Sequence, residues 1–286
     1  MSNADIDYIE SELRLTTSGG KYLKTWPPVS GHWGNAIARL ESLRTAAVPP
    51  PPAPSPTPVP VGAVIFEDDF NGPLDTVKWE GKSYKAPSGT QWNKLLNASI
   101  DGNSNLVITA NLVNGQWYSS FLAGLASNGF SYSGPRYLET RAKVPAGLGC
   151  FAAPLWEWAS PWGAGPIEID VCEQLGKEPG FYHTTVHPWL PSGDKPVGAA
   201  NPTPVKNLAD DFHRYGAAVY ASRVDFYFDG YFMWSADMSV SGLNPLTSYP
   251  VVPCIDLDMG GWGGAIDPAL TSATMLVDYV RVWRLA

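Results

Sequence analysis

The stretch 166-PIEIDVCEQ-174 decides the fold that we expect for most of the chain, because it reads as a β-strand that also carries three acids. Its isoleucine and valine residues alternate with polar ones, so one face can meet a hydrophobic core while Glu168 and Asp170 project from the other. Glu173 is out of step by one residue. In a regular strand it would return to the core, where an unpaired carboxylate is costly.

One inserted residue near Val171-Cys172 would restore Glu173 to the acidic face, and we therefore predict a β-bulge there. Bulges are frequent beside active sites because they re-aim a side chain. With the bulge, Glu168 and Glu173 would lie about four strand steps apart, roughly 13 Å between Cα atoms. On a concave sheet, their side chains could lean inward to the roughly 5 to 5.5 Å separation of the carboxyl pair in a retaining glycosidase.

Three acids so close together suit glycosidic acid–base chemistry, but the residues alone leave two alternatives open. Such carboxylates cannot all ionise easily, so at least one should keep its proton to a raised pH. One carboxylate could then attack a sugar while a protonated one donates to the leaving oxygen. The acids could equally form a solvated strand face or bind a hard cation, although calcium sites more often use flexible loops that contain glycine.

Outward from this stretch, residues 61–286 consist of short β-patterns separated by turn residues, with no long amphipathic helix. Asp229-Gly230, between two aromatic runs, is a strong signal for a tight hairpin. Many short strands over about 225 residues predict a large antiparallel sandwich or barrel. The clearest strand patterns are 105-NLVITANLV-113, 136-RYLETRAKV-144, 181-FYHTTVH-187, 213-HRYGAAVY-220, 223-RVDFYFDGYFMW-234 and 274-TMLVDYVRVW-283.

Charge and composition limit the partners of this protein. The 286 residues carry a net charge of −8 with no long Lys/Arg run, so we expect it to bind neither nucleic acid nor anionic membranes. No apolar run approaches the roughly 18 residues of a membrane span, so no membrane insertion is expected. Aromatic residues reach 12%, with 12 Trp, which suits either a large β core or a groove that stacks neutral sugar faces.

The three cysteines, Cys150, Cys172 and Cys254, cannot all pair with one another. No CxxC spacing indicates a zinc site or a redox pair. We expect three buried thiols, with a Cys150–Cys172 bridge as the alternative if their strands are neighbours.

A proline-rich segment, 49-PPPPAPSPTPVP-60, separates a short N-terminal piece from the β-rich region. Eight prolines in twelve positions favour a polyproline II spacer of roughly 37 Å, with an SH3-type ligand as the functional alternative. Residues 1–48 contain two short helical patterns, too few for an independent core. They should dock on a protein partner, oligomerise or stay partly disordered, and we favour docking. The N-terminus lacks the basic start and apolar region of a secretory signal, so we expect a soluble protein that is not exported by that route.

Several motifs in order along residues 64–284 resemble glycoside hydrolase family 16. The E-x-D-x-x-E form of Glu168 to Glu173 is similar to the bulged, laminarinase-like branch of that family. The stretches 64-VIFEDDFNGPLDTVKW-79, 134-GPRYLETRAKVPAGLG-149, 184-TTVHPW-189 and 275-MLVDYVRVW-283 are similar to others that flank it. The resemblance implies an all-β jelly roll of two curved antiparallel sheets, the concave one forming a sugar cleft. The resemblance does not include residues 1–60.

The resemblance also implies roles for single residues. Glu168 would be the nucleophile, Glu173 the general acid/base, and Asp170 a group that tunes the charge of the nucleophile. His187 matches a His near the reacting centre, and Trp156 matches a Trp that packs against the sugar. Weaker stacking candidates, any of which could be a core or rim residue, are Trp158, Trp162, Trp189 and Trp262.

No cofactor is implied for the reaction, but members of the family often hold a structural calcium ion on the convex side. Asp278 in 277-VDYVRV-282 matches the usual side-chain ligand, with backbone help near Asp68 and Gly102. Asp278 could equally cap a strand end or pair with Arg281.

Three departures from the family pattern make the polysaccharide an open question. Ile167 stands where Gly commonly precedes the nucleophile. Asp256, a candidate substrate-binding residue, stands where the laminarinase branch usually has Asn and adds charge near the cleft. The segment 158-WASPWGAGPI-167 is not a close laminarinase match.

The leading hypothesis is a retaining endo-glycosidase that acts outside the cell on a β-linked glucan or galactan. A transglycosylase of the same fold, or a non-catalytic carbohydrate-binding module, are the alternatives. A docking segment on a proline spacer would suit an enzyme carried on a larger assembly, such as the tail of a virus particle. A truncated export signal or a specialised secretion route would explain the same architecture.

Overall fold

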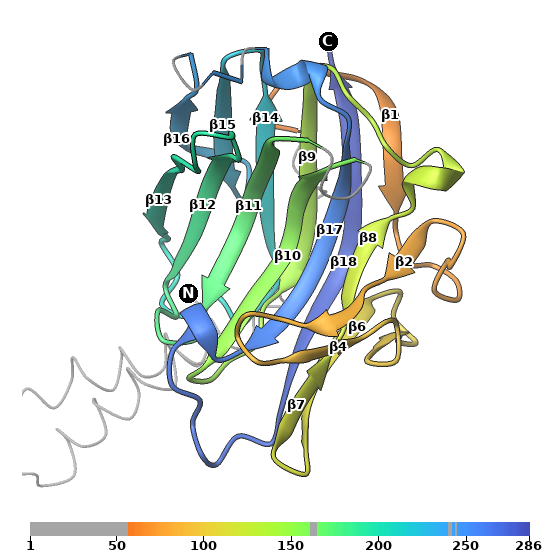
Figure 1. Ribbon diagram of the computed structural model, residues 1–286, viewed down its shortest axis with the longest axis vertical. Coiled ribbons are helices and arrows are strands. Elements are labelled where there is room, and N and C mark those ends of the chain that lie inside the picture. Colours follow the sequence, from red (N-terminus) through yellow and green to blue (C-terminus); the bar gives the residue numbers. More distant parts are fainter. Residues whose placement is uncertain (1–56, 161–164, 240–241, 244) are drawn as a thin grey trace, which may run out of the picture. The chain divides into compact units, whose positions relative to one another are not determined.

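The predicted strand patterns form two facing β-sheets in the computed structural model (Figure 1). The structure describes residues 57–160, 165–239, 242–243 and 245–286. The chain divides into two units, Met1–Ser55 and Pro56–Ala286, and every described residue belongs to the second. The helical segment of residues 1–48, most of the proline spacer 49–60, and Trp162 lie outside the described residues, so the expectations for them stay predictions.

An eleven-stranded sheet forms one layer. Its order is β16-β15-β14-β9-β18-β6-β7-β4-β3, with β1 added on β18 and β5 on β6. All of its pairs are antiparallel except β4 with β7. The strands are β1 (Val61–Asp68), β3 (Ser83–Lys85), β4 (Gln91–Asn93), β5 (Ala98–Ile100), β6 (Leu106–Val113), β7 (Gln116–Ser119), β9 (Arg136–Lys143), β14 (His213–Val219), β15 (Arg223–Phe228), β16 (Tyr231–Asp237) and β18 (Ser272–Leu285).

A seven-stranded antiparallel sheet forms the other layer, with the order β13-β12-β11-β10-β17-β8-β2. Its strands are β2 (Trp79–Gly81), β8 (Phe121–Gly124), β10 (Cys150–Ala159), β11 (Ile167–Leu175), β12 (Phe181–Pro188), β13 (Val197–Pro202) and β17 (Val251–Met259). The acidic stretch is β11, near the middle of this sheet. The all-β jelly-roll expectation is therefore confirmed for the described residues.

The main hydrophobic core lies between the two sheets. Ile167, Ile169 and Val171 of β11 are fully buried in it, together with Leu138 of β9 and Val280 of β18. Burial of such side chains stabilises the fold by roughly 1.5 to 3 kcal/mol each. Because these residues alternate along the strand, the face of β11 opposite to the core is left for polar side chains.

The predicted β-bulge lies where the sequence placed it. Asp170 pairs with Thr185 and Glu173 with His183, so three steps along β11 match two steps along β12. Val171 and Cys172 are both buried in the main core, which is how Glu173 regains the phase of Glu168 and Asp170. The bulge is confirmed.

The predicted Asp229-Gly230 hairpin is also confirmed, as the two-residue loop between β15 and β16. Both loop residues have positive φ, 49° and 83°, and glycine adopts this conformation without strain. Such a turn matches the right-handed twist of the two strands that it joins.

The three cysteines are free and buried, as expected. β10 and β11 are indeed neighbours, yet Cys150 and Cys172 do not form the alternative bridge. The described helices are three short 3₁₀ turns, Ala126–Asn128, Leu246–Ser248 and Gly261–Gly263. In this part of the chain, no helix has the length and hydrophobicity to cross a membrane.

Candidate active site

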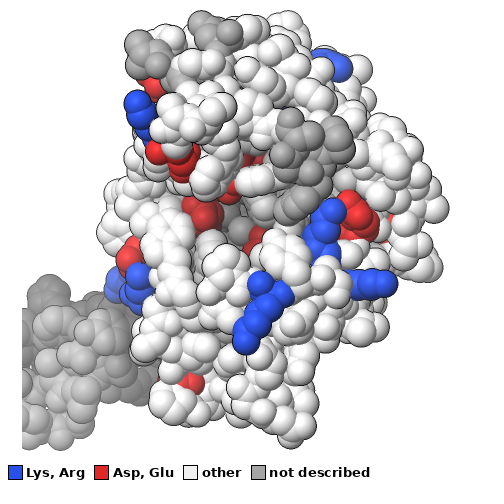
Figure 2. All heavy atoms as spheres, in the orientation of Figure 1, with Lys and Arg blue, Asp and Glu red and all other residues white. Residues whose placement is uncertain are grey.

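A cleft of about 320 Å³ lies over the seven-stranded sheet. Glu168, Asp170 and Glu173 of β11 all line it, together with Asp256 and Asp258 of β17. Figure 2 shows acidic side chains inside the hollow of this face. The bulge is what makes the arrangement possible, because without it Glu173 would face the core.

Glu168 lies among groups that favour its ionised form. The indole Nε1 of Trp189 donates a hydrogen bond of 2.7 Å to its Oε2. Burial raises the pKa of Glu168, while this hydrogen bond and the nearby His187 oppose the rise. A carboxylate with such partners can stay charged and act as a nucleophile.

Glu173 lies in a setting that favours its protonated form. Burial and the charge of Glu168 raise its pKa to about 8, although Thr185 donates a hydrogen bond to it. Both glutamates therefore have raised pKa values, but only at Glu168 does a nearby imidazole join a hydrogen bond in opposing the rise, which favours Glu168 as the nucleophile and Glu173 as the acid. Asp170 lies between them, and burial, followed by the charges of Glu173 and Glu168, holds its pKa well above the usual range.

His187 connects Asp170 to a loop residue that the sequence analysis missed. Its Nε2 lies 3.4 Å from Oδ2 of Asp170, and its Nδ1 lies 2.6 Å from Oδ2 of Asp194. The imidazole stacks on the indole of Trp189, with ring centroids 5.2 Å apart and planes at 10°. Asp194 and Trp189 therefore fix the position and orientation of the imidazole beside the acids.

Asp194 follows β12 in a short loop whose residues show no periodic pattern. Its only signal in the sequence is an acid after Gly193, seven residues beyond His187. Many exposed turns have that composition. The contact depends on how the loop folds back, which the sequence does not state.

The tryptophan candidates in the described part of the chain differ in their position relative to the cleft. Trp156 and Trp262 line the cleft, and Trp262 is 44% exposed. Trp189 is also 44% exposed, and it contacts Glu168 rather than the lining around Asp256. Trp158 lies between Trp156 and Trp189, with ring centroids 5.8 and 6.2 Å away, and is not among the lining residues.

Asp256 lies in the cleft, as expected, and has a neighbour that was missed. Trp156 Nε1 donates a 2.8 Å hydrogen bond to its Oδ1. Burial and the charge of Asp258 hold the pKa of Asp256 well above the usual range. Asp258 stands two positions later on β17 and faces the same side. That spacing is a readable signal, but sequence reasoning did not join the two acids.

Among the described residues, the group that geometry alone would allow to hold a metal ion is Glu168, Asp170 and His187. Their ligand atoms lie within 4.8 Å of one another. One oxygen of Glu168 and one nitrogen of His187 already have the hydrogen-bond partners Trp189 and Asp194. We therefore interpret the group as acid–base machinery.

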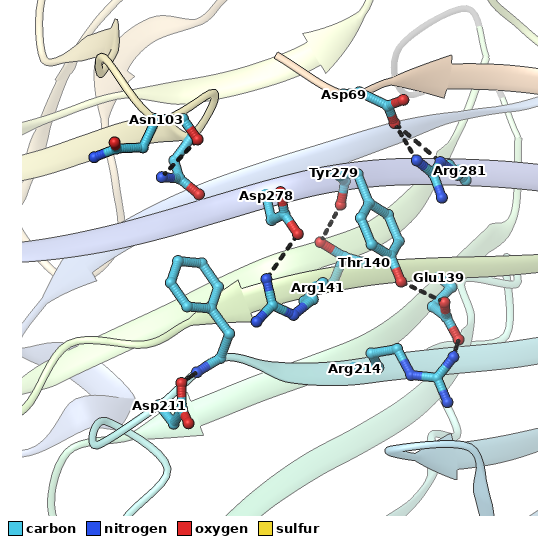
Figure 3. Close-up of polar contacts among 12 residues, drawn as sticks. Asp69, Asn103, Glu139, Thr140, Arg141, Asp211, Arg214, Asp278, Tyr279 and Arg281 are labelled. Atoms are coloured by element: carbon cyan, nitrogen blue, oxygen red, sulfur yellow. Dashed lines mark hydrogen bonds and ion pairs between the residues drawn. The ribbon is translucent and has the colours of Figure 1, made fainter. Parts of the chain in front are cut away.

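Asp278, the side chain expected to bind calcium, is engaged by an arginine. Asp278 Oδ2 accepts a 2.8 Å hydrogen bond from Arg141 Nη1, as Figure 3 shows. Asp68 accepts bonds from the backbone N–H of Phe70 and the indole of Trp79. The Arg141 guanidinium supplies to Asp278 the positive charge that an ion would bring, and the structural calcium stays a prediction. Gly102 lies in the turn between β5 and β6.

The pairing of Asp278 differs from the alternative that the sequence suggested. Arg281, the expected partner, pairs instead with Asp69, at 2.8 Å. Figure 3 shows the two ion pairs side by side on the eleven-stranded sheet. The register explains the difference, because Tyr279 lies opposite Arg141 and a bulge at Asp278 brings the acid to the same arginine.

Comparisons with known proteins agree with this geometry. Residues 91–281 match the family described as Glycosyl hydrolases family 16. A keratan-sulfate endo-1,4-beta-galactosidase of Sphingobacterium multivorum is 30% identical over 240 residues, which cover 78% of this chain and 55% of that protein. A glucan endo-1,3-beta-glucosidase A1 of Niallia circulans is 26% identical over 77% of this chain and 38% of that protein. The chain thus spans about half or less of the length of these two relatives.

A solved structure supports the fold over most of the described chain. The endo-beta-1,3-glucanase of Pyrococcus furiosus superimposes with a TM-score of 0.66 at 25% identity, covering 78% of this chain and 95% of that one. The two-sheet sandwich and its cleft of carboxylates define a jelly-roll protein with a carbohydrate-type site. The chain belongs to glycosyl hydrolase family 16.

Proposed function

We propose that this protein is a retaining endo-glycosidase that hydrolyses a β-linked polysaccharide. The observation that carries the proposal is the shared cleft of Glu168, Asp170 and Glu173. Burial raises the pKa of both glutamates, but Trp189 and His187 oppose the rise at Glu168, whereas the charge of Glu168 adds to the rise at Glu173. Family membership and the relatives named as endo-acting galactosidase and glucosidases support the same reaction class.

In the first step, Glu168 attacks the anomeric carbon of the sugar. The glycosidic C–O bond breaks as Glu173 transfers its proton to the leaving oxygen, and a glycosyl ester forms on Glu168. Trp189 Nε1, bonded to Oε2 of Glu168, leaves the other oxygen for attack. Burial keeps the proton on Glu173 until this step, because it raises the pKa of that carboxyl to about 8.

In the second step, Glu173 acts as a base. Its carboxylate takes a proton from water, whose oxygen attacks the anomeric carbon and breaks the ester bond to Glu168. Glu168 returns as a carboxylate and Glu173 again holds a proton, so the site is regenerated. Two inversions leave the product with the anomeric configuration of the substrate.

Asp170 and His187 tune the charge of the nucleophile. Asp170 lies between the glutamates, and His187 lies 3.4 Å from it, held by Asp194. As the negative charge of Glu168 moves into the ester, a proton can shift within this group at little cost, because coupled carboxyls share protons. Trp156 and Trp262 supply flat apolar faces for the sugar rings.

The substrate in this proposal is a glucan or galactan type of polysaccharide, the classes in the names of the two relatives. A reducing-end release screen over β-1,3-glucan, mixed-linkage glucan, galactans and arabinogalactan tests it. Oligosaccharides of several lengths early in the reaction would indicate endo cleavage. Products larger than the starting glycan at high acceptor concentration would indicate the transglycosylase alternative. Binding without cleavage across the panel would favour the binding-module alternative and overturn the proposal.

Azide rescue tests the retaining mechanism and the two roles separately. With an activated aryl β-glycoside, Glu168→Ala should give the α-glycosyl azide, because azide attacks directly where the nucleophile is missing. Glu173→Ala should give the β-glycosyl azide, because azide replaces water on the glycosyl ester. Two products of the same configuration would contradict the assignment of roles.

We also propose that residues 1–48 dock on a protein partner or a larger assembly, such as a virus particle tail, and that the enzyme acts outside the cell. The support is the sequence pattern of two short helices before a proline spacer. Pull-down with residues 1–60 fused to a carrier tests the docking proposal, with the catalytic unit alone as the control. Equal recovery of host proteins by both would contradict it.

A further inference from the structure

The cleft is unusual in the charge of its lining. Five of its lining residues are acids, three from β11 and two from β17. None of the described residues that line it is a lysine, arginine or histidine. The nearby rim cations are engaged: Lys177 Nζ donates to the backbone oxygen of Trp262 at 3.0 Å, and Lys82 Nζ pairs with Glu80.

Asp258 is the acid in this set to which neither the motif nor the proposed mechanism gives a role. It is only 4% exposed, and its Oδ1 has no hydrogen-bond partner among the described residues. Burial raises the pKa of Asp258 to about 6, in spite of hydrogen bonds from the side chains of Ser88, Thr90 and Trp92. A buried carboxylate oxygen without a partner is costly in an empty protein, and it is satisfied when a ligand hydroxyl donates to it.

Asp256 lines the same cleft. The indole Nε1 of Trp156 donates a hydrogen bond to its Oδ1. The two carboxylates stand two positions apart on one face of β17, beside the aromatic rings of Trp156 and Trp92. Aromatic faces beside acceptor oxygens match a sugar ring, which is apolar on its faces and carries hydroxyl donors on its edge.

A sulfate ester or a uronate requires a positively charged lining, which is the opposite of what this cleft offers. Such groups are anions and are normally bound by arginine or lysine, often in bidentate pairs. In this cleft they would approach five acids, with no lysine, arginine or histidine among the described lining residues. Like charges placed together at a binding site oppose association.

We propose that this cleft accepts only uncharged sugar units, with Asp256 and Asp258 as specificity-determining residues that accept hydrogen bonds from sugar hydroxyls. The substrate is then a neutral β-linked polysaccharide, without sulfate or uronate at the units next to the cleaved bond. The kinetic test of this inference rests on the proposed endo-glycosidase function. The second test measures binding alone and does not need turnover.

The kinetic test compares matched pairs of polysaccharides with the full chain. Keratan sulfate is compared with the same preparation after chemical desulfation, and laminarin with laminarin sulfate. The neutral member should be cleaved with a kcat/KM at least about tenfold higher, given the effective interaction of charges a few ångströms apart. Equal kcat/KM for the two members of a pair, or a preference for the sulfated one, would overturn the proposal.

Charge-removing variants test the two residues. Asp256→Asn and Asp258→Asn keep the shape of each side chain but remove its charge, so each should lower the neutral-to-sulfated ratio by roughly threefold. Asp237→Asn, an exposed acid on β16 of the other sheet, makes the same change in net charge and should leave the ratio unchanged. An unchanged ratio in both cleft variants would remove these residues from the proposal.

A binding measurement separates this inference from the proposed function. Affinity electrophoresis of Glu168→Gln in gels that contain the neutral or the sulfated polysaccharide needs no turnover. Stronger retardation by the neutral member supports the inference even if the wild type cleaves nothing, in which case the hydrolase proposal alone fails. Stronger retardation by the sulfated member overturns the inference even if hydrolysis is established.

Discussion

The acids of the cleft and several acids elsewhere in the fold are buried to a similar degree, but they differ in their hydrogen-bond and ion-pair partners. Glu157 of β10 is fully buried and receives hydrogen bonds from Nε and Nη2 of Arg136. Glu139 of β9 is 3% exposed and accepts hydrogen bonds from the hydroxyls of Tyr137 and Tyr279. Figure 3 shows the bond from Tyr279. Asp170, in contrast, is 3% exposed with no hydrogen-bond partner for Oδ2 among the described residues.

This difference separates structural acids from functional ones. A buried carboxylate with a cation or several donors is neutralised and stabilises the arrangement around it. A group of buried carboxylates without cations has shifted pKa values and can exchange protons with a substrate, at a cost to folding. Substitutions of the cleft acids should therefore change activity, whereas substitution of Glu157 should change stability.

Glu168→Gln should lower kcat by about 10³-fold or more, because an amide cannot form the glycosyl ester. The measurement is single-substrate kinetics on the polysaccharide identified by the screen. The far-UV circular dichroism spectrum and Tm should stay close to wild type, since the cleft acids do not support the core. A variant that keeps more than a tenth of the activity would contradict the role of Glu168.

Glu157→Leu should destabilise the protein by about 3 to 5 kcal/mol, because it leaves the guanidinium of Arg136 buried without its partner. Urea unfolding gives the free-energy difference. The double variant Arg136→Met with Glu157→Leu serves as the matched control, and it should recover much of the loss because no unpaired charge remains. Equal losses in the single and double variants would show that packing, and not charge, dominates at this pair.

Glu173 should make the protein less stable as pH rises, which is the opposite of the usual effect of a carboxyl group. Its pKa is raised from 4.5 in the unfolded chain to about 8 in the folded one, so the folded state binds the extra proton between these values. The free energy of unfolding should therefore fall as pH rises through this window. Glu173→Gln should flatten this slope, and a slope of the same size in the variant would assign it to other groups. The kcat/KM profile should lose activity near pH 8 as Glu173 loses its proton.

Asp194→Asn should lower kcat by roughly tenfold with little change in KM, because it weakens the 2.6 Å contact that orients His187 beside Asp170. Steady-state kinetics separates the two parameters. Asp211→Asn, an exposed acid at the start of β14 on the other sheet, is the matched control and should match the wild type. An increase in KM alone would show that Asp194 holds substrate and does not position the imidazole.

Metal removal should have the smallest effect. Chelation with EDTA should leave kcat unchanged, because the proposed chemistry uses only side chains, and should shift Tm little, because Arg141 already pairs with Asp278. The structural calcium stays a prediction, and Arg141→Gln sharpens it by freeing the carboxylate. Added calcium should then raise Tm more in this variant than in the wild type, whereas a large calcium effect on the wild type would mean that the ion displaces the arginine.

Local sequence patterns were sufficient to predict the strand and the bulge that carry the three acids. The alternation of Ile167, Ile169 and Val171 predicted β11, and the one-residue slip at Glu173 predicted its bulge. Positive φ at Asp229 and Gly230 was readable from the residue types. These features depend on neighbours within a few residues, because side-chain direction in a strand and turn geometry are set locally.

Contacts between side chains of distant segments could not be predicted from local sequence patterns. The sequence suggested Arg281 for Asp278, but the register of β18 with β9 brings Arg141 there instead. Trp158 has the same residue type and spacing as a stacking residue, yet it is not among the residues that line the cleft and instead packs between Trp156 and Trp189. Residue type alone does not say which of several tryptophans lines a surface.

The strands, the bulge, the hairpin and the shared face of the three acids could be predicted from the residues alone, because each follows from a period of two residues or from turn chemistry. The other features required the folded chain: β17 adds Asp256 and Asp258 to the same cleft, Asp194 folds back onto His187, and Arg136 neutralises Glu157, while no described lysine, arginine or histidine lines the cleft. Those contacts join residues from separate strands and loops, and their charges interact only once the two sheets have fixed the distances between them.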